Sequence, residues 1–88
     1  MDSEQFAQLR LRAMAAAQIY GCEADLQESD LFPLDSPLGA VGLKVVVAKR
    51  SPSGELKVRE HDVRLPREDL SAAVTRLVRE AARKLPDS

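Results

Sequence analysis

The sequence predicts a small α+β domain in which a helix, a β-hairpin and a second helix pack as two layers (αββα). Apolar residues recur at three- and four-residue steps over residues 3–20 and again over 66–85, which indicates two amphipathic helices. Between them, residues 42–63 hold a valine-rich run, a turn and an alternating run, which is typical of a hairpin. A chain of 88 residues has room for a single domain, residues 1–88.

The first helix, residues 3–20, has a capping residue at its start and a glycine after its end. Ser3 or Asp2 can cap it, because a side-chain oxygen at this position accepts a hydrogen bond from a free backbone N–H group. Gly21 tolerates the left-handed conformation in which many helices end. The alanine-rich run Ala13–Ala17 carries little bulk, so another element can approach the helix closely there.

Residues 22–41 form an acidic segment without clear periodicity, and we predict that it is irregular. It holds five acidic residues and two prolines. Because a structureless loop of about 20 residues is unusual in a compact domain, two alternatives stay open. Asp25–Asp30 could form a helical turn, or residues 31–34 could form a short third strand at the sheet edge, where proline is tolerated.

The hairpin depends on a strong turn signal at Ser51–Gly54. Proline presets the second turn position and glycine supplies the positive φ that follows. In the second strand, Leu56 and Val58 alternate with charged residues, but Val63 falls on the opposite parity. A β-bulge near residues 60–61 would explain this slip, and so would an end of the strand at that point.

The second helix, residues 66–85, has signals at both ends. Pro66 fits the first helical position, because the N–H group that proline lacks has no partner inside the helix there. The acidic residues 68–69 would lie in the first turn and the basic residues 83–84 in the last turn. Both placements suit the helix dipole, so this helix is the best-defined element of the prediction.

Residues that carry most enzyme chemistry are scarce in this chain. It has one histidine, His61, and one cysteine, Cys22, whereas a structural zinc site takes four such ligands. The glycines match neither the phosphate-binding loop nor the dinucleotide fingerprint. His61 beside Asp62 is the one acid–base candidate, and a solvent-facing strand histidine is the simpler interpretation. We therefore expect a protein that is not an enzyme and that uses no cofactor and no metal.

The sequence also bears on location and on charge. No apolar run is long enough for a membrane span, the first residues are acidic rather than basic, and a lone cysteine is unusual in a small secreted domain. We expect a cytoplasmic protein without membrane contact. The net charge of −1 hides a split: residues 1–40 carry two basic and seven acidic residues, and residues 41–88 carry eleven basic and seven acidic residues.

The missing chemistry, the split charge and the broad apolar helix faces favour a non-enzymatic protein–protein interaction module, such as a small adaptor, regulator, inhibitor or assembly factor. Its partner would be another protein or a second copy in a homodimer. The predicted contact residues are Asp25, Glu28, Asp30, Leu31, Phe32, Lys49 and Arg50. The alternative is a nucleic-acid-binding protein that uses the basic hairpin and the last helix, through Lys49, Arg50, Lys57, Arg59, Arg76 and Arg79. The isoelectric point of about 5.8 argues against this alternative.

Two general resemblances concern the order of elements. A helix, a hairpin with a glycine turn and a helix together resemble small phage head–tail connector proteins of the lambda W type. The run Val45–Val47 through Glu55, followed by Leu65–Leu70, resembles the strand–turn–strand and proline-started helix of FlaG-type flagellar proteins. The acidic segment 22–41 departs from the first pattern, and the long second strand before the proline departs from the second. Neither resemblance implies a role for any residue.

Overall fold

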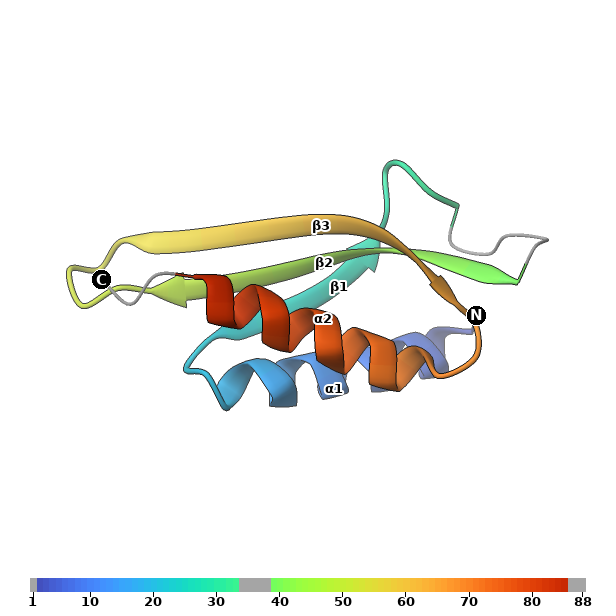
Figure 1. Ribbon diagram of the computed structural model, residues 1–88, viewed down its shortest axis with the longest axis horizontal. Coiled ribbons are helices and arrows are strands. Elements are labelled where there is room, and N and C mark those ends of the chain that lie inside the picture. Colours follow the sequence, from blue (N-terminus) through green and yellow to red (C-terminus); the bar gives the residue numbers. More distant parts are fainter. Residues whose placement is uncertain (1, 34–38, 86–88) are drawn as a thin grey trace.

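The chain forms a helix, three strands and a second helix. In order these are α1 (Ser3–Gln18), β1 (Glu23–Glu28), β2 (Ala40–Arg50), β3 (Leu56–Pro66) and α2 (Leu70–Lys84). The structure is a computed structural model, and it describes residues 2–33 and 39–85. The strands form one antiparallel sheet in the order β1-β2-β3, and both helices lie on the same face of it (Figure 1). The predicted α+β class is confirmed, and neither helix of the described residues covers the other face of the sheet.

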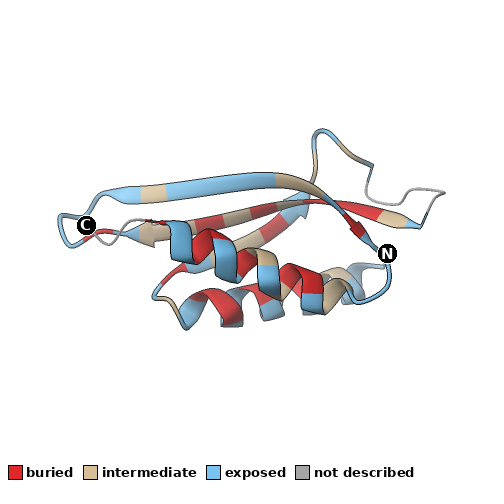
Figure 2. Ribbon diagram, in the orientation of Figure 1, coloured by how far each residue is buried: buried red, intermediate tan, exposed pale blue. Residues whose placement is uncertain are grey.

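The core lies between the helices and the central strand β2. Alternate side chains of β2 are buried, while its neighbour β3 is exposed along most of its length (Figure 2). Ala13, Ala16 and Ala17 of α1 are buried in this layer, which agrees with the close approach that their small side chains allow. The central buried residues are Val41, Leu43, Val45 and Val47 of β2, Leu26 of β1, Ala13 and Ala17 of α1, and Val74 and Val78 of α2.

Helix α1 begins where the sequence predicts. The Oδ1 atom of Asp2 accepts a hydrogen bond of 2.8 Å from the backbone N–H of Gln5, so Asp2 is the capping residue. After the helix, Gly21 has a φ of 70°, the left-handed conformation that glycine adopts at low cost. Within the described ranges 2–33 and 39–85, no helix is long and apolar enough to cross a membrane.

The segment that we predict to be irregular contains a strand, and this part of the prediction is wrong. Residues 23–28 form β1, which pairs with β2 so that Leu26 lies opposite Val45. The third strand of the sheet is therefore at Glu23–Glu28 and not at residues 31–34. Residues 31–33 are outside any strand, and residue 34 lies outside the described residues. Strand β1 forms because Ala24 and Leu26 share one face and pack on the core, with polar residues between them.

The predicted turn at Ser51–Gly54 is confirmed. The shift of the apolar residues of β3 from even to odd positions, however, is caused neither by a bulge nor by an end of the strand. The N–H of Gly54 donates to the carbonyl of Ser51 over 2.9 Å, and Gly54 has a φ of 89°. The β2–β3 register runs from Ala40 opposite Pro66 to Arg50 opposite Leu56 without interruption. The slip arises because the apolar residues of β3 change from one face of the sheet to the other along the strand.

Helix α2 begins at Leu70, four residues later than predicted. Pro66 is the last residue of β3 and lies opposite Ala40 in the sheet, so its role as the first helical residue was predicted wrongly. Asp69 precedes the helix in a left-handed conformation with a φ of 58°, and its side chain makes no capping hydrogen bond. The basic residues of the last turn, Arg83 and Lys84, are where the sequence predicts them.

Candidate functional site

Two of the three acidic residues that we predict to bind a partner, Asp25 and Asp30, make contacts inside the molecule. Asp25 of β1 accepts a hydrogen bond from Arg10 of α1, with Nε 2.8 Å from Oδ1, and the two form an ion pair. Asp30 accepts a hydrogen bond of 2.6 Å from Lys44 on β2. This hydrogen bond raises the pKa of the Lys44 ammonium above its usual 10.5. Asp25 and Asp30 therefore fasten α1 and the segment after β1 to the sheet.

The segment that follows β1, residues 29–33, crosses the open face of the sheet, and we name it the crossing loop. The hydroxyl of Ser29 donates to Asp62 of β3 over 2.7 Å and accepts from the backbone N–H groups of Leu31 and Phe32. In Figure 1 the loop rises from the end of β1 on the side of the sheet opposite the helices. Hydrogen bonds of Ser29, Asp30 and Pro33 fix the loop to the sheet, and Leu31 is left 71% exposed.

Gly42 of β2 makes this crossing possible. Its N–H donates to the carbonyl of Pro33 over 3.0 Å, and a Cβ atom at this position would lie 2.6 Å from the Cβ of Phe32. The guanidinium of Arg64 lies over the ring of Phe32, with its Cζ atom 5.1 Å from the ring centroid. This is a cation–π contact. Phe32 is thus a structural residue of the loop, and Leu31 is the apolar residue that the loop presents to solvent.

The remaining predicted contact residues lie at two separate places: Glu28 directly precedes the crossing loop, and Lys49 and Arg50 are far from it. Glu28 ends β1 and lies opposite Leu43, whereas Lys49 and Arg50 are at the hairpin end of β2. Leu43 and Lys49 are six positions apart along β2, a distance of about 20 Å. The guanidinium of Arg50 donates to the carbonyl of Gly54 over 3.1 Å and so closes the turn. Within one molecule, the predicted protein-binding residues do not form one site.

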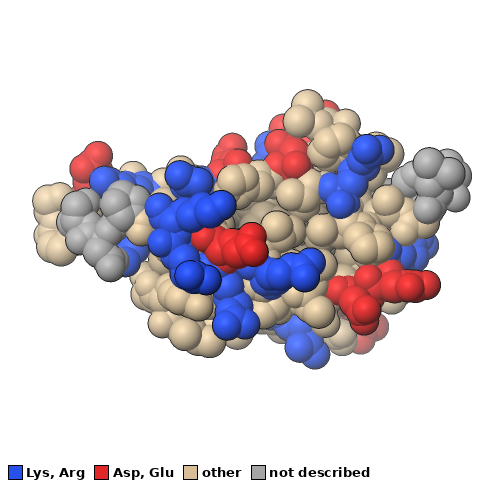
Figure 3. Space-filling view, in the orientation of Figure 1, with Lys and Arg blue, Asp and Glu red and all other residues tan. Residues whose placement is uncertain are grey.

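The basic residues of the alternative prediction come closer together. Four of them lie on α2 and on the helix-facing side of β3, and they form what we call the basic face. Figure 3 shows blue side chains gathered over α2 and the adjoining strand, with one red group among them. None of the cations of the basic face has a hydrogen bond or ion pair with another described residue. The basic face consists of Lys57 and Arg59 of β3 and Arg76, Arg79, Arg83 and Lys84 of α2.

The basic face is electrostatically unfavourable in the isolated molecule. Arg76, Arg79 and Arg83 follow each other at three- and four-residue steps, so they are neighbours on the helix surface. Lys57 lies directly opposite Lys49 across the hairpin. Like charges in both arrangements repel each other. Glu80 is the only acidic residue of α2, so this repulsion is only partly compensated.

The charges of the two sheet edges differ in sign. Strand β1, at one edge, carries three acidic residues and no basic residue. Helix α2 carries four basic residues and one acidic residue, and it packs near the opposite edge, β3. The split that the sequence shows between its two halves is therefore a split across the sheet, and an overall charge of −1 coexists with a strongly basic surface.

A second surface, which the sequence analysis missed, lies on the open face near the hairpin. Leu56 and Val58 of β3 are 49% and 47% exposed there. Val46 and Ala48 of β2 share this face and are half-buried, since Ala48 lies opposite Val58. We name these four residues the open-face patch. Its signal in the sequence was the parity slip of β3, which marks the change of the apolar residues from the open face to the core face.

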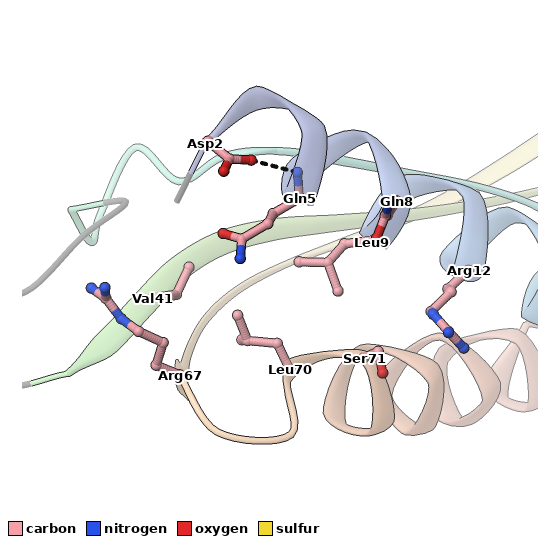
Figure 4. Close-up of a pocket in the computed structure, with 9 residues that line it drawn as sticks. All are labelled: Asp2, Gln5, Gln8, Leu9, Arg12, Val41, Arg67, Leu70 and Ser71. Atoms are coloured by element: carbon pink, nitrogen blue, oxygen red, sulfur yellow. Dashed lines mark hydrogen bonds between the residues drawn. The ribbon is translucent and has the colours of Figure 1, made fainter.

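A pocket of about 480 Å³ lies between the first turns of the two helices, with Val41 of β2 at its base (Figure 4). Its polar side chains include Arg12 and Arg67, which extend from opposite sides of the pocket. Asp2, the one carboxylate among the described residues of the lining, is already bonded to the backbone of α1. The lining thus offers hydrogen-bond donors but no carboxylate or histidine that is free to act as a base.

His61 and Cys22, the single histidine and the single cysteine of the chain, are not placed to act together in catalysis. His61 lies on the helix-facing side of β3, opposite Val45, and is exposed. Asp62 points to the other face, as successive strand residues do, and it binds Ser29. The suggested pairing of His61 with Asp62 is therefore wrong. Cys22 is buried, and its thiol lies 3.6 Å from the carbonyl of Tyr20.

Among residues 2–33 and 39–85, no three His, Cys, Asp or Glu side chains lie together as metal ligands would. Comparisons of the chain with protein-family models, with curated proteins and with solved structures find no match.

Proposed function

We propose that this protein is not an enzyme and that it binds the phosphate backbone of double-stranded nucleic acid through the basic face. The observation that carries the proposal is the group of six cations on α2 and β3, none of which is hydrogen-bonded or ion-paired to another described residue; within α2 they are accompanied by a single carboxylate, Glu80. Such a group costs stability unless an anion neutralises it, and phosphate groups in a row are the natural partner. The protein acts in the cytoplasm, the compartment that its single cysteine favours.

The shape of the basic face supports a duplex partner. Arg76 to Arg83 span seven residues of helix, which is a row of about 10 Å at 1.5 Å per residue. Lys57 and Arg59 lie on the helix-facing side of β3, the strand that α2 contacts, and Arg79 also lines the groove between α1 and α2. A group of long cations of this kind can follow a phosphate backbone without recognising bases. We therefore expect binding that depends little on sequence.

The absence of aromatic side chains from the basic face argues against a single-stranded partner. Single strands are usually held by bases stacked on Phe, Tyr or Trp. Of the three aromatic residues of the chain, Phe6 and Tyr20 pack against the core, with Tyr20 lining the same groove between the helices as Arg79, and Phe32 is in the crossing loop on the open face. A duplex, whose phosphates are outside and whose bases are stacked already, suits the surface better.

Fluorescence anisotropy with a labelled duplex of about 20 base pairs tests the proposal. Each phosphate contact makes the binding constant about tenfold higher at about 50 mM salt than at 1 M salt. Arg79→Gln removes one such contact, so it should weaken binding up to about tenfold at about 50 mM salt. Arg50→Gln is the matched control, because it removes the same charge from the hairpin tip, where Arg50 faces away from the helices. It should change the affinity less than about twofold.

The triple variant Arg76→Gln, Arg79→Gln and Arg83→Gln should reduce binding to background. Circular dichroism should confirm that it folds, since all three residues are exposed. Equal losses in Arg79→Gln and Arg50→Gln would mean that only net charge matters and would contradict a site at the basic face. Tighter binding of a single strand than of a duplex would contradict the choice of partner.

A further inference from the structure

The helix-facing side of β3 carries a row of polar side chains that α2 does not cover. Arg59 and His61 lie opposite core valines of β2, so they are on the side of the sheet that faces the helices, and Lys57 follows the same alternation. Helix α2 packs mainly on β2, and β3 therefore stays exposed along most of its length (Figure 2). Arg59 and His61 are exposed, and Lys57 is half-buried.

His61 continues the row that two cations of the basic face begin. Lys57, Arg59 and His61 follow each other at two-residue steps, and each step is about 7 Å along a strand. The three side chains thus form one row on β3 beside α2. A phosphate backbone that contacts Lys57 and then Arg59 reaches His61 at the next step of the row.

The two carboxylates next to His61 in the sequence are on the other face of the sheet. Glu60 and Asp62 alternate with His61 along β3, so both belong to the open face. Glu60 lies opposite Val46, a residue of the open face, and Asp62 accepts the hydrogen bond from Ser29 there. Neither carboxylate shares the helix-facing side of β3 with His61.

The elements packed beside His61 are apolar or mostly basic. Strand β2 presents buried apolar side chains next to it, and α1 packs on β1 and α2 rather than on β3. Helix α2 carries Glu80 as its one acidic residue, and no described residue forms a hydrogen bond or ion pair with His61. The charged residues of α2 that surround Glu80 are Arg76, Arg79, Arg83 and Lys84.

An imidazole is the one kind of side chain in this row whose charge changes near neutral pH. Histidine side chains lose their positive charge between about pH 5 and pH 8, whereas lysine and arginine side chains stay charged over this range. The imidazolium attracts a phosphate and donates hydrogen bonds from both ring nitrogens, and the neutral ring donates from one nitrogen only. The phosphate affinity of this row therefore depends on pH at His61.

We propose that His61 is a further phosphate contact of the basic face and that it makes duplex binding proton-linked. The duplex binds the imidazolium form better than the neutral form, so binding takes up a proton and the affinity rises as the pH falls below neutrality. His61 acts in this way only if the duplex lies on the basic face, so the proton linkage rests on the proposed function. It adds that the phosphate backbone follows β3 beside α2.

Fluorescence anisotropy with the labelled duplex at pH 7.5 and pH 5.5, both at about 50 mM salt, tests the linkage. The wild type should bind about three- to tenfold more tightly at pH 5.5, since one phosphate contact contributes up to about tenfold at this salt concentration. His61→Gln keeps every other group that titrates, and its affinity should differ less than about twofold between the two pH values. His61→Lys carries a permanent charge, so at pH 7.5 it should bind as tightly as the wild type binds at pH 5.5.

The matched control moves the histidine to the other face of the same strand. Val58 belongs to the open-face patch and is 47% exposed, so the double variant His61→Gln, Val58→His has a histidine away from the helices and should not regain the pH dependence. Regained dependence, or dependence that persists in His61→Gln, would overturn the assignment to His61. His61→Lys that binds no more tightly than His61→Gln at pH 7.5 would overturn the contact without any change of pH.

The two proposals fail in different ways. If the wild type binds the duplex with the same affinity at both pH values, the proton linkage is wrong and the basic face remains the binding site. If the wild type does not bind the duplex at pH 7.5 or at pH 5.5, both proposals are wrong.

Discussion

The substitution Gly42→Ala tests how the crossing loop is held, because it adds one methyl group under the loop. The new Cβ atom would lie 2.6 Å from the Cβ of Phe32, 2.6 Å from the carbonyl oxygen of Pro33 and 2.7 Å from that of Phe32. Ordinary contacts of a Cβ atom begin at 3.4 Å, so the loop has to move by about 0.8 Å. Two of the three atoms belong to the backbone, and no change of rotamer can relieve these contacts.

The expected loss is the sum of three effects. Overpacking of this kind costs about 1–3 kcal/mol. Loss of the 3.0 Å hydrogen bond from Gly42 to Pro33 costs about 1 kcal/mol more. Alanine is more favourable than glycine inside a strand by about 0.5–1 kcal/mol, which offsets part of this loss in the free energy of unfolding. We therefore expect the free energy of unfolding of Gly42→Ala to fall by about 1–3 kcal/mol.

Urea unfolding followed by far-UV circular dichroism, at one fixed protein concentration, measures this loss. Ala48→Gly is the matched control, since it makes the reverse change on the same face of the same strand, at a position that the loop does not cross. It should cost no more than about 1 kcal/mol. If Gly42→Ala unfolds at the same urea concentration as the wild type, or at a higher one, residues 32–33 do not cross β2 as described.

Three further predictions concern the turn, the basic face and the loop. Gly54→Ala should lower the free energy of unfolding by about 1 kcal/mol, because Gly54 has a φ of 89°, although an added Cβ atom would meet no neighbour within 4 Å. Urea unfolding measures this loss, and an unchanged midpoint would contradict the turn geometry. Arg79→Gln should stabilise the isolated protein by a few tenths of a kcal/mol, since it removes like-charge repulsion; a lower melting temperature would contradict that repulsion. The pKa of Lys44 is raised in the folded state, so the stability that its pair with Asp30 contributes is complete below pH 10.5 and is lost as the pH rises through the folded pKa. The difference in stability between the wild type and Asp30→Asn should therefore be smaller at pH 11.5 than at pH 7, and a constant difference would contradict the pairing.

The class of the fold could be predicted from the sequence because its signals are local. The capped first helix, the Ser51–Gly54 turn and the long apolar stripe of the last helix each depend on neighbouring residues. Strand β1 was missed because only Ala24 and Leu26 face the core, which is too short an alternation to recognise. The start of α2 was predicted too early because Pro66 suits both a helix start and the end of an edge strand, and the sheet register decides between them.

The candidate sites depended on contacts between distant residues. Nothing in the sequence indicates that Asp25 and Asp30 are bound to Arg10 and Lys44, so both looked free to bind a partner. The change in alternation at Val63 is visible in the sequence. Which face of the sheet each apolar residue of β3 lies on, however, depends on where the helices pack, and they cover β1 and β2 and leave the hairpin end of β3 bare. Charge counts for the whole chain likewise concealed the basic face, because the acidic residues that balance it lie on another edge.

The salt dependence of duplex binding tests the central claim most directly, because it counts the phosphates that the protein neutralises. For each phosphate contact, the logarithm of the binding constant falls by about 0.9 when the salt concentration rises tenfold. Six cations therefore limit the slope of log K against log salt concentration to about −5. We predict a slope between about −3 and −5 for the wild type, reduced by about one in Arg79→Gln and unchanged in Arg50→Gln. A slope near zero, or no binding at about 50 mM salt, would contradict nucleic-acid binding by the basic face.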